Sequence, residues 1–393
     1  MTLSKMYGFR LLAAPGVQRS VLVVLLVMVL AYRGLQLIAL SGQIQWGYDF
    51  SAYWLAASHV LDGVPIYADW QLAGQYSPQQ QYLYLYPPFL AVALTPLAAV
   101  FPTDYRLANL VWAVIGAIVA AAVVAAVARR EGIGSGRDTV LLVAGAFAFP
   151  PLVGELVMGN VHLLLLGLLG GAWLALRDDR RPMPAIAGIL VGVATLIKLF
   201  PGLVIVWLVL RGRYRAALWS LAAIAVLAMA TLPVTGIDAW LDYPRVLLNL
   251  GPPVDNRDTL APIVWLSSFM PPLAARVVVV VAMVAAVVWA ARTTSEPVSF
   301  AVAVTASILI APALYQHYLA ILVLPLLVAL RWAPPWTWVA VAYLAMFGGE
   351  QAAFGESAWI INRLLPTLGA ILLLVGLMVR GSRAPAQAAT VAE

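Results

Sequence analysis

The sequence contains no cysteine and little charge. Only 10% of its 393 residues are Asp, Glu, Lys or Arg, whereas roughly a quarter are charged in an ordinary soluble domain. The lack of cysteine excludes disulfide bonds, thiolate metal ligands and thiol catalysis. The lack of charge, together with 63% hydrophobic residues, excludes a soluble globular protein and indicates an integral membrane protein.

Lysine is also scarce, since Lys5 and Lys198 are the only two in the chain. The formal net charge of +6 therefore reflects mostly arginine. The arginines stand in short clusters between apolar runs, at residues 129–137, 177–181 and 211–215. Such clusters are typical of cytoplasmic loops, whereas nucleic-acid binding would need one continuous basic face. We expect membrane lipids as partners and no nucleic acid.

Several apolar runs are each near the roughly 20 residues that cross a hydrocarbon core. We predict an all-α, polytopic membrane protein with about 12 transmembrane helices. Residues 1–380 would form a single membrane domain, and residues 381–393 a short disordered cytoplasmic tail. The first apolar run, residues 20–40, follows basic residues but has no signal-peptide cleavage site after it, so we interpret it as the first span.

On this topology two long segments, residues 41–86 and 235–260, face the outside of the membrane. The first contains no Lys or Arg and many Tyr, Trp, Gln and Pro residues, and long structured loops of this kind are usually functional. Residues 89–100 are short for a complete span, and we predict a re-entrant or partial crossing. Residues 155–160 and 198–201 are expected on the same outer side.

Residues 46–67 predict an amphipathic helix in the first outer loop. Apolar residues recur at helical spacing over residues 50–61, and Gly63 and Pro65 end the pattern. We expect this helix to lie in the membrane interface with its apolar face toward lipid. Asp49 stands where a helix cap would be, and a carboxylate in a cleft is equally suited to act as a general base. The sequence favours neither role.

Polar side chains at membrane depth indicate cavities or sites, because an ionisable group there costs at least roughly 2.5 to 3.5 kcal/mol. Lys198 lies in a helix break at Pro201, where it would bind a lipid phosphate or snorkel to the interface. His317 would donate to a phosphate or be a satisfied interfacial histidine. Glu155 and Asn160 flank a predicted outer turn, where they would bind sugar hydroxyls or belong to an ordinary polar loop.

Other familiar chemical motifs are missing from the sequence. No Gly-rich phosphate loop, no cluster of His and carboxylates with zinc-ligand spacing and no Ser-His-Asp arrangement is legible. We therefore predict no metal site and no cofactor. The sequence leaves open whether a divalent metal ion assists.

Five stretches carry a resemblance to a known family. In chain order they are YDFSAYWLAASHVLDGVPIY, YLYPPFLAVALTPLA, MGNVHLLLLGLL, GILVGVATLIKLFPGLVIVWLVLRGRYRAA and PALYQHYLAILVLPLL. This ordered set resembles the polyprenol-phosphate-mannose-dependent mannosyltransferases of glycosyltransferase family 87, over most of the chain up to about Pro325. The family commonly has Gly-Gln-x-Asn where this chain has GNVH at residues 159–162, and Ser and Trp in the segment that here reads residues 311–316.

The resemblance implies a GT-C type membrane enzyme that moves a hexose, typically mannose, from a polyprenyl phosphate to a hydroxyl of a glycolipid or glycan. The reaction would occur at the extracytoplasmic face of a bacterial plasma membrane and would invert a β-linked donor to an α-glycoside. Asp49 matches the catalytic aspartate of the family. The candidates for binding the donor phosphate are Lys198, then His317 and Arg257. The candidates for binding the substrates are Tyr53, His59, Tyr86, Glu155 and Asn160.

Two alternatives stay open at this point. A GT-C enzyme of another kind would move a different sugar, or act as a glycan polymerase or ligase. A lipid or solute transporter would line its pathway with Asp49, Lys198 and His317. We find no inverted repeat in the sequence, which counts against the commonest transporter architectures.

Overall fold

The computed structural model describes residues 16–76, 82–133, 136–177, 183–251, 259–348 and 364–381, with side chains from residue 20 onward. Within these ranges the chain forms helices and no β-strand, apart from one isolated β-bridge between Tyr76 and Leu250. The all-α prediction is therefore confirmed for the described residues. The expected tail, residues 381–393, lies outside them except for its first residue.

Four helices are long and apolar enough to cross a membrane, and a bent pair makes up to five candidate spans among the described residues. The four are α1 (Gly16–Ser41), α6 (Tyr105–Arg130), α12 (Tyr214–Asn249) and α14 (Pro272–Thr293). The pair is α7 (Gly136–Ala148) and α8 (Pro150–Met158), which meet at 61°. These helices indicate a membrane-embedded protein, but the expected count of about 12 spans is not confirmed.

The remaining apolar helices are shorter. They are α9 (His162–Leu176), α10 (Pro184–Ile197), α11 (Gly202–Leu210), α13 (Pro262–Leu266), α15 (Glu296–Leu309), the 3₁₀ helix η3 (Gln316–Leu322), α16 (Val323–Trp332), α17 (Thr337–Ala345) and α19 (Leu365–Gly381). Helix α15 is buried on every side from Pro297 to Leu309, between α11, α14, α16 and α19. Since a helix that is apolar all round belongs in a core, α15 marks the centre of the bundle.

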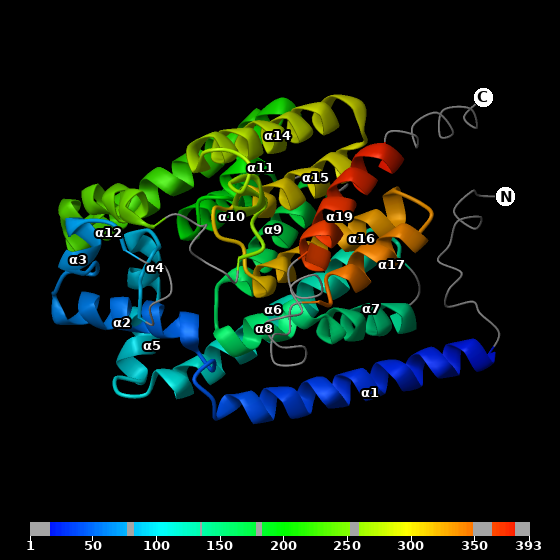
Figure 1. Cartoon of the computed structure of the whole chain (residues 1–393), viewed down its shortest axis with the longest axis horizontal. Helices are drawn as coiled ribbons and strands as arrows, with labels where there is room; N and C mark the ends of the chain where they lie inside the picture. Colours follow the sequence, from blue (N-terminus) through cyan, green and yellow to red (C-terminus); the bar gives the residue numbers. More distant parts are fainter. Residues whose placement is uncertain are drawn as a thin grey trace.

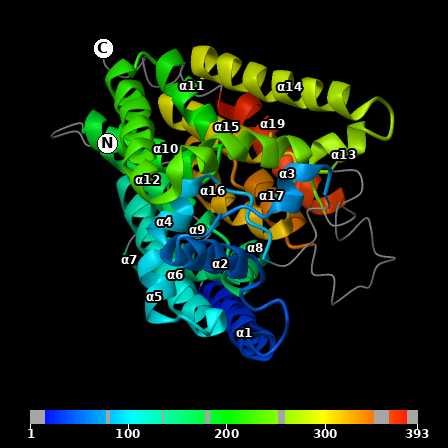
Figure 2. The ribbon, with the colours of Figure 1, turned by 90° about the vertical axis from the view of Figure 1, so that its left-hand side faces the viewer.

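The segments of the expected first outer loop, and the two short helices after it, gather at one end of the molecule (Figure 1). They form α2 (Tyr48–Asp62), α3 (Asp69–Ala73), α4 (Pro88–Ala93) and α5 (Thr95–Val100). In Figure 1 these helices lie at the left-hand end, and α1 starts and α19 ends at the right. Figure 2 views the same end directly, with α2 and α3 toward the viewer. Together α4 and α5 would extend only about 18 Å at 1.5 Å per residue, and the partial crossing of residues 89–100 stays a prediction.

Helix α2 ends as predicted but does not present its apolar face to lipid. Gly63 adopts the left-handed conformation, φ 68°, that ends a helix. Phe50, Tyr53 and Ala57 are at most 1% exposed, because α2 packs on α4, α5, α6 and α8. The expected interfacial position of this helix is therefore not confirmed, since protein covers the face that was expected to meet lipid.

The first part of the expected second outer loop, residues 235–260, is helical, and its outer position stays a prediction. Helix α12 continues to Asn249, with a bend at Gly236, whose φ of 72° and ψ of 165° are not helical. Beyond the bend Ala239, Tyr243 and Val246 are buried at helical spacing, in a segment that packs on α3 and α4. Residues 252–258 lie outside the described residues.

Two polar contacts, a buried one at Glu131 and a partly exposed one at Glu296, join the arginine-bearing helix ends. Glu131, after α6, accepts hydrogen bonds from Trp173 Nε1 of α9 (2.8 Å) and Trp332 Nε1 of α16 (2.6 Å). Arg213, before α12, binds both carboxylate oxygens of Glu296 at 2.9 Å. The ends of α6, α9 and α16 thus meet at Glu131, and α12 meets α15 at the Arg213–Glu296 pair.

Replacing Glu131 with Ala should lower the midpoint of thermal unfolding by about 5 °C, because two indole N–H groups lose their acceptor at roughly 1–3 kcal/mol each. The midpoint is measured on detergent-purified protein. Glu131→Gln keeps one acceptor oxygen and should shift the midpoint less. An unchanged midpoint for the Ala variant would contradict the role of this carboxylate in joining the three helices.

Candidate active site

Five polar side chains, three from breaks between helices and two from within α2 and η3, come together at the end of the bundle near α2. Asp49 lies in the first turn of α2, Tyr86 precedes α4, and Asn160 joins α8 to α9. Lys198 lies between α10 and α11, and His317 is in η3. All five were predicted as site residues. Their backbones lie at helix ends or in a 3₁₀ turn, where the side chains approach each other without interrupting a long helix.

Asp49 binds two side chains from other elements and does not cap its helix. The N-cap of α2 is Gly47, and no side chain caps it. Asn160 Nδ2 donates to Asp49 Oδ2 at 2.8 Å, and His317 Nε2 lies 3.0 Å from the same oxygen. The carboxylate is 24% exposed. Burial raises the pKa of Asp49, but the hydrogen bonds from His317 and Asn160 outweigh it, so its pKa is below the usual value. A charged, partly accessible carboxylate results.

Asn160 is held in place by the tight turn that ends α8. Gly159 has a φ of 68°, and a Cβ there would lie 1.9 Å from Asn109 Oδ1, so only glycine fits. Trp112 Nε1 donates to the Asn160 carbonyl at 3.0 Å, and Tyr86 OH donates to Asn160 Oδ1 at 3.3 Å. The turn therefore fixes the amide that contacts Asp49.

The outer turn predicted for residues 155–160 is wrong except at its last two residues. Residues 150–158 form α8, which begins with Pro150 and Pro151, residues that suit the first turn of a helix. The paired prolines were a sequence sign of a helix start. Glu155 is 2% exposed within this helix, so it is not a loop residue in water.

Lys198 confirms the predicted break in the apolar stretch 184–210. Helix α10 ends at Ile197, Lys198 is extended (φ −149°, ψ 132°), and α11 begins at Gly202. Lys198 Nζ lies 3.3 Å from Tyr86 OH, 3.2 Å from His162 Nε2 and 3.8 Å from the centre of the Tyr318 ring. The ammonium therefore points into the polar cluster and does not extend along the surface.

Tyr53 and Tyr86 form an aromatic wall beside the cluster. Tyr53 OH donates to Tyr86 OH at 2.7 Å, and the ring centres lie 4.8 Å apart, edge to face. Tyr53 follows Asp49 by four residues and so lies on the same face of α2. Because Tyr53 is 0% exposed, its contact with the cluster passes through Tyr86.

Two residues of the cluster were missed from the sequence. His162, the first residue of α9, is 0% exposed and lies between Glu155 and Lys198. Tyr318 follows His317 in η3, and its ring centre is 4.0 Å from that of His162. A histidine directly after the GNV turn and a tyrosine next to His317 were the signals available.

Two predicted site residues are not in the cluster. His59 lies ten residues after Asp49 on α2, about 15 Å along the helix, and its Nδ1 lies 2.9 Å from the carbonyl oxygen of Pro65. Arg257 falls in residues 252–258, outside the described residues. The cluster therefore consists of Asp49, Tyr53, Tyr86, Glu155, Asn160, His162, Lys198, His317 and Tyr318.

The family model of glycosyltransferase family 87 matches residues 84–314. The match covers more than half of the chain. The chain belongs to glycosyltransferase family 87. It is a membrane glycosyltransferase, which uses a sugar donor and an acceptor. No curated protein and no solved structure matches the sequence.

The matched region of this family 87 glycosyltransferase includes Tyr86, Asn160 and Lys198 but neither Asp49 nor His317. The family match alone therefore does not identify a base. What links Asp49 and His317 to the matched region is the geometry, since Asn160 donates to Asp49 and His317 contacts the same carboxylate oxygen.

Glu155, His162 and His317 are of residue types that bind metal ions, and one ligand atom of each lies within 4.8 Å of the others. Their contacts favour a hydrogen-bonded cluster without a metal ion. Both nitrogens of His162 have partners, since Nδ1 faces Glu155 at 3.1 Å and Nε2 faces Lys198 Nζ at 3.2 Å. A divalent cation bound there would also lie close to the Lys198 ammonium, which repels it.

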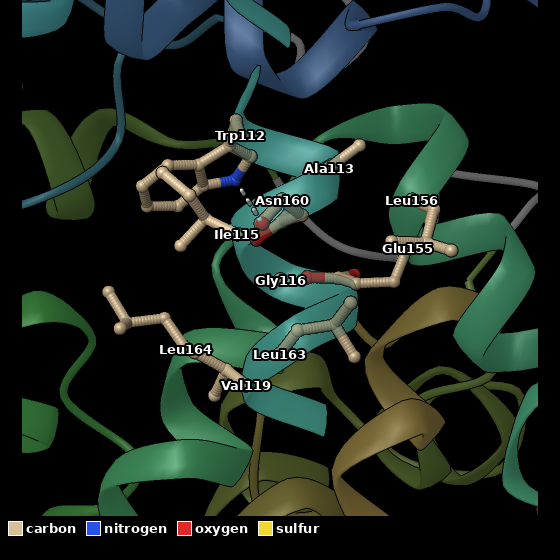
Figure 3. Close-up of a pocket in the computed structure, with 10 residues that line it drawn as sticks. All are labelled: Trp112, Ala113, Ile115, Gly116, Val119, Glu155, Leu156, Asn160, Leu163 and Leu164. Carbon is tan, nitrogen blue, oxygen red and sulfur yellow. Dashed lines mark hydrogen bonds between the residues drawn. The ribbon is translucent and has the colours of Figure 1, made fainter. Parts of the chain in front are cut away.

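A small pocket of about 20 Å³ lies beside the cluster, between α6 and α9. Figure 3 shows Glu155 and Asn160 at this pocket with the apolar residues around them. The lining consists of Trp112, Ala113, Ile115, Gly116, Val119, Glu155, Leu156, Asn160, Leu163 and Leu164. Two polar side chains thus border an otherwise apolar space. Ile115 at its edge is 45% exposed on the outer side of α6.

Proposed function

We propose that this glycosyltransferase transfers a hexose, most simply mannose, from a polyprenyl-phosphate donor to a hydroxyl of a glycolipid or glycan, with inversion at the anomeric carbon. The observation that carries the proposal is the pairing of a charged carboxylate with an ammonium group in one cluster. Asp49 and Lys198 are joined through Asn160 and Tyr86. The transfer needs these two charges, one for each side of the anomeric carbon.

In the proposed reaction Asp49 accepts the proton of the acceptor hydroxyl while its oxygen attacks the anomeric carbon. The bond from that carbon to the phosphate oxygen breaks, and its electron pair stays on the phosphate. The ammonium of Lys198 stabilises the charge that develops there, with His317 as a further donor. Phosphate is a good leaving group, so one base is sufficient and no acid is needed.

The pocket between α6 and α9 supports a lipid-linked donor. Its apolar lining suits a polyprenyl chain, whereas a nucleotide donor would need polar groups for a base and a ribose. Asn160 belongs to both the pocket and the cluster. A lipid chain in the pocket would therefore leave its phosphate beside the polar residues.

The placement of the arginines supports an active site on the extracytoplasmic side of a bacterial plasma membrane. Arg177 and Arg213 lie at the helix ends joined through Glu131 and Glu296, and such basic ends stay in the cytoplasm. Helices α2 to α5 lie at the end where α1 finishes, opposite its start (Figure 1). The first outer loop would then face the extracytoplasmic space.

The test is sugar transfer by the purified protein in detergent, with a polyprenyl-phosphate mannose donor and a membrane glycolipid extract as acceptor. We expect a mannosylated lipid with an α-linkage, identified by mass spectrometry and by digestion with linkage-specific mannosidases. Transfer only from another polyprenyl-phosphate sugar would correct the sugar and keep the donor class. Transfer from none of these donors would contradict the proposal.

Narrowing the pocket should weaken long-chain donors selectively. Gly116→Leu adds a side chain toward Leu163, which a Cβ at Gly116 would already approach to 3.0 Å. We expect the KM for a long polyprenyl donor to rise about tenfold, because the chain loses the burial of one or two apolar groups. The KM for a short-chain donor should not change. Val114→Leu is the matched control, since Val114 is 50% exposed on the same helix outside the pocket. Equal effects on both donors would contradict a lipid-binding role.

A further inference from the structure

Glu155 and His162 form a buried ionisable pair that the proposed reaction does not use directly. Their side chains are 1% and 0% exposed. The two carboxylate oxygens of Glu155 lie 3.2 and 3.1 Å from His162 Nδ1, and one of them also accepts the backbone N–H of His162. The carboxylate therefore fixes the backbone and the ring of His162 together.

This contact determines which ring nitrogen of His162 carries the proton. A neutral imidazole has one N–H and one lone pair, and a carboxylate accepts but does not donate. With Glu155 ionised, Nδ1 holds the proton and donates it to Glu155, and the lone pair is on Nε2. Nε2 faces Lys198 Nζ at 3.2 Å, so it accepts a hydrogen bond from the ammonium.

The surroundings of Lys198 leave one N–H for a ligand. An ammonium has three donors, and in the described part of the chain Nζ has two hydrogen-bond partners, His162 Nε2 and Tyr86 OH. The face of the Tyr318 ring, 3.8 Å away, supports the charge from another side. Lysine has a flexible four-carbon stem, so these partners define where the ammonium lies.

We propose that Glu155 and His162 act as a positioning pair that holds the Lys198 ammonium against the donor phosphate. Glu155 acts through His162, and neither residue touches the reacting atoms. The inference rests on the proposed function for its kinetic effect, but the contact itself can be tested without sugar transfer. It assigns Glu155 a different role from the sugar binding expected from the sequence.

Through Lys198 and Tyr318 the pair connects four elements of the fold. Glu155 lies in α8, His162 starts α9, Lys198 follows α10, and Tyr318 is in η3. A change at Glu155 therefore reaches the ammonium that faces the phosphate through His162. This order of contacts predicts which kinetic constants change.

We expect Glu155→Gln and His162→Leu to lower kcat/KM for the lipid-linked donor about tenfold, the effect of one hydrogen bond to a charged group. The KM for the acceptor should stay within about twofold, because Asp49 and its partners are intact. Glu131→Gln is the matched control. It changes a buried carboxylate at the C-terminal end of α6, away from the cluster, and should leave the donor KM unchanged. Equal increases in the donor and acceptor KM would overturn the proposal.

A double-mutant cycle separates positioning from a structural role. In a Lys198→Met background the further change Glu155→Gln should alter kcat/KM by less than about twofold, because the group that it positions is gone. A purely structural Glu155 would cost the same factor in both backgrounds, and that outcome overturns the proposal.

A labelling experiment tests the contact independently of activity. Lys5→Arg leaves Lys198 as the single lysine, so a small amine-reactive reagent reports on it alone when the labelled peptide is quantified by mass spectrometry. Glu155→Gln and His162→Leu should each label about threefold faster or more, because the ammonium loses its stabilising partners. Rates equal to the parent overturn the positioning pair. If the parent transfers no sugar but the rates change, the proposed function fails and the contact stands.

Discussion

Replacing Asp49 with Asn should reduce kcat/KM for sugar transfer about 10³-fold, within the range of roughly 10² to 10⁴ that general bases contribute. The amide keeps nearly the same shape but cannot accept the proton of the attacking hydroxyl. Asp49 is the group to test because its carboxylate is charged, partly exposed and held by Asn160 and His317. The measurement is the initial rate of transfer with purified protein, together with its thermal unfolding midpoint.

The matched control for this variant is Asp62→Asn, at the exposed end of the same helix. It removes the same charge and should keep the parental rate within about twofold, since exposed substitutions are usually close to neutral. If Asp49→Asn retains the parental rate while remaining folded, Asp49 is not the base. The same result would remove the main support for the two-charge mechanism.

The lowered pKa of Asp49 also has a consequence for the pH profile. Transfer requires the deprotonated carboxylate, and a lower pKa keeps it deprotonated at lower pH. The rate should therefore be insensitive to Asp49 protonation near neutral pH and fall only in the acid range. The hydrogen bonds from His317 and Asn160 produce this shift.

Local sequence signals predicted the parts of the fold that depend on one or two residues. Gly63 ends α2, and Pro201 is the N-cap of α11 after the break at Lys198, as expected from the backbone properties of glycine and proline. Glycine acts through its access to positive φ, and proline through its fixed φ and its missing backbone N–H. Neither effect needs a tertiary contact. These signals placed Asp49 and Lys198 near helix ends correctly.

The parts that depended on packing were not predictable in this way. Residues 150–158 fold as α8 because most of its residues are buried by neighbouring elements, and the segment is too short for its periodicity to decide. The second half of α12 resumes after Gly236 because Ala239, Tyr243 and Val246 find partners on α3 and α4. A loop was the reasonable expectation where the sequence alone showed polar residues and proline.

The site itself depends on contacts across long separations in the chain. Asp49 and Asn160 are 111 residues apart, and Tyr86 and Lys198 are 112 apart. Asp49, Asn160 and Lys198 were predicted singly, from the cost of placing polar groups in a membrane, and Tyr86 from the family resemblance. The sequence did not predict His162, because an isolated histidine among leucines gives no indication that Glu155 and Lys198 lie on either side of it.

Replacing Lys198 with Met should lower kcat/KM for the donor by about 10² to 10³, the usual effect of losing one donor to a developing oxyanion. Methionine keeps the length and apolar stem of the side chain and removes the charge. The leaving phosphate gains negative charge as the bond to the sugar breaks, so both the donor KM and kcat should worsen. The acceptor KM should not change, and product inhibition by polyprenyl phosphate should weaken in parallel.

Two further variants, Arg215→Met and Lys198→Arg, test whether the effect of Lys198 depends on its position or only on its charge. Arg215→Met removes one cation from an exposed position of α12 and should leave the donor KM unchanged. Lys198→Arg keeps the charge but replaces a compact ammonium with a planar fork that does not fit between His162 and Tyr86, so it should recover only part of the rate. If Arg fully restores transfer, only the charge matters at this position. If Met and parent bind polyprenyl phosphate equally, the phosphate lies elsewhere, and Lys198 instead balances the buried charge of Glu155.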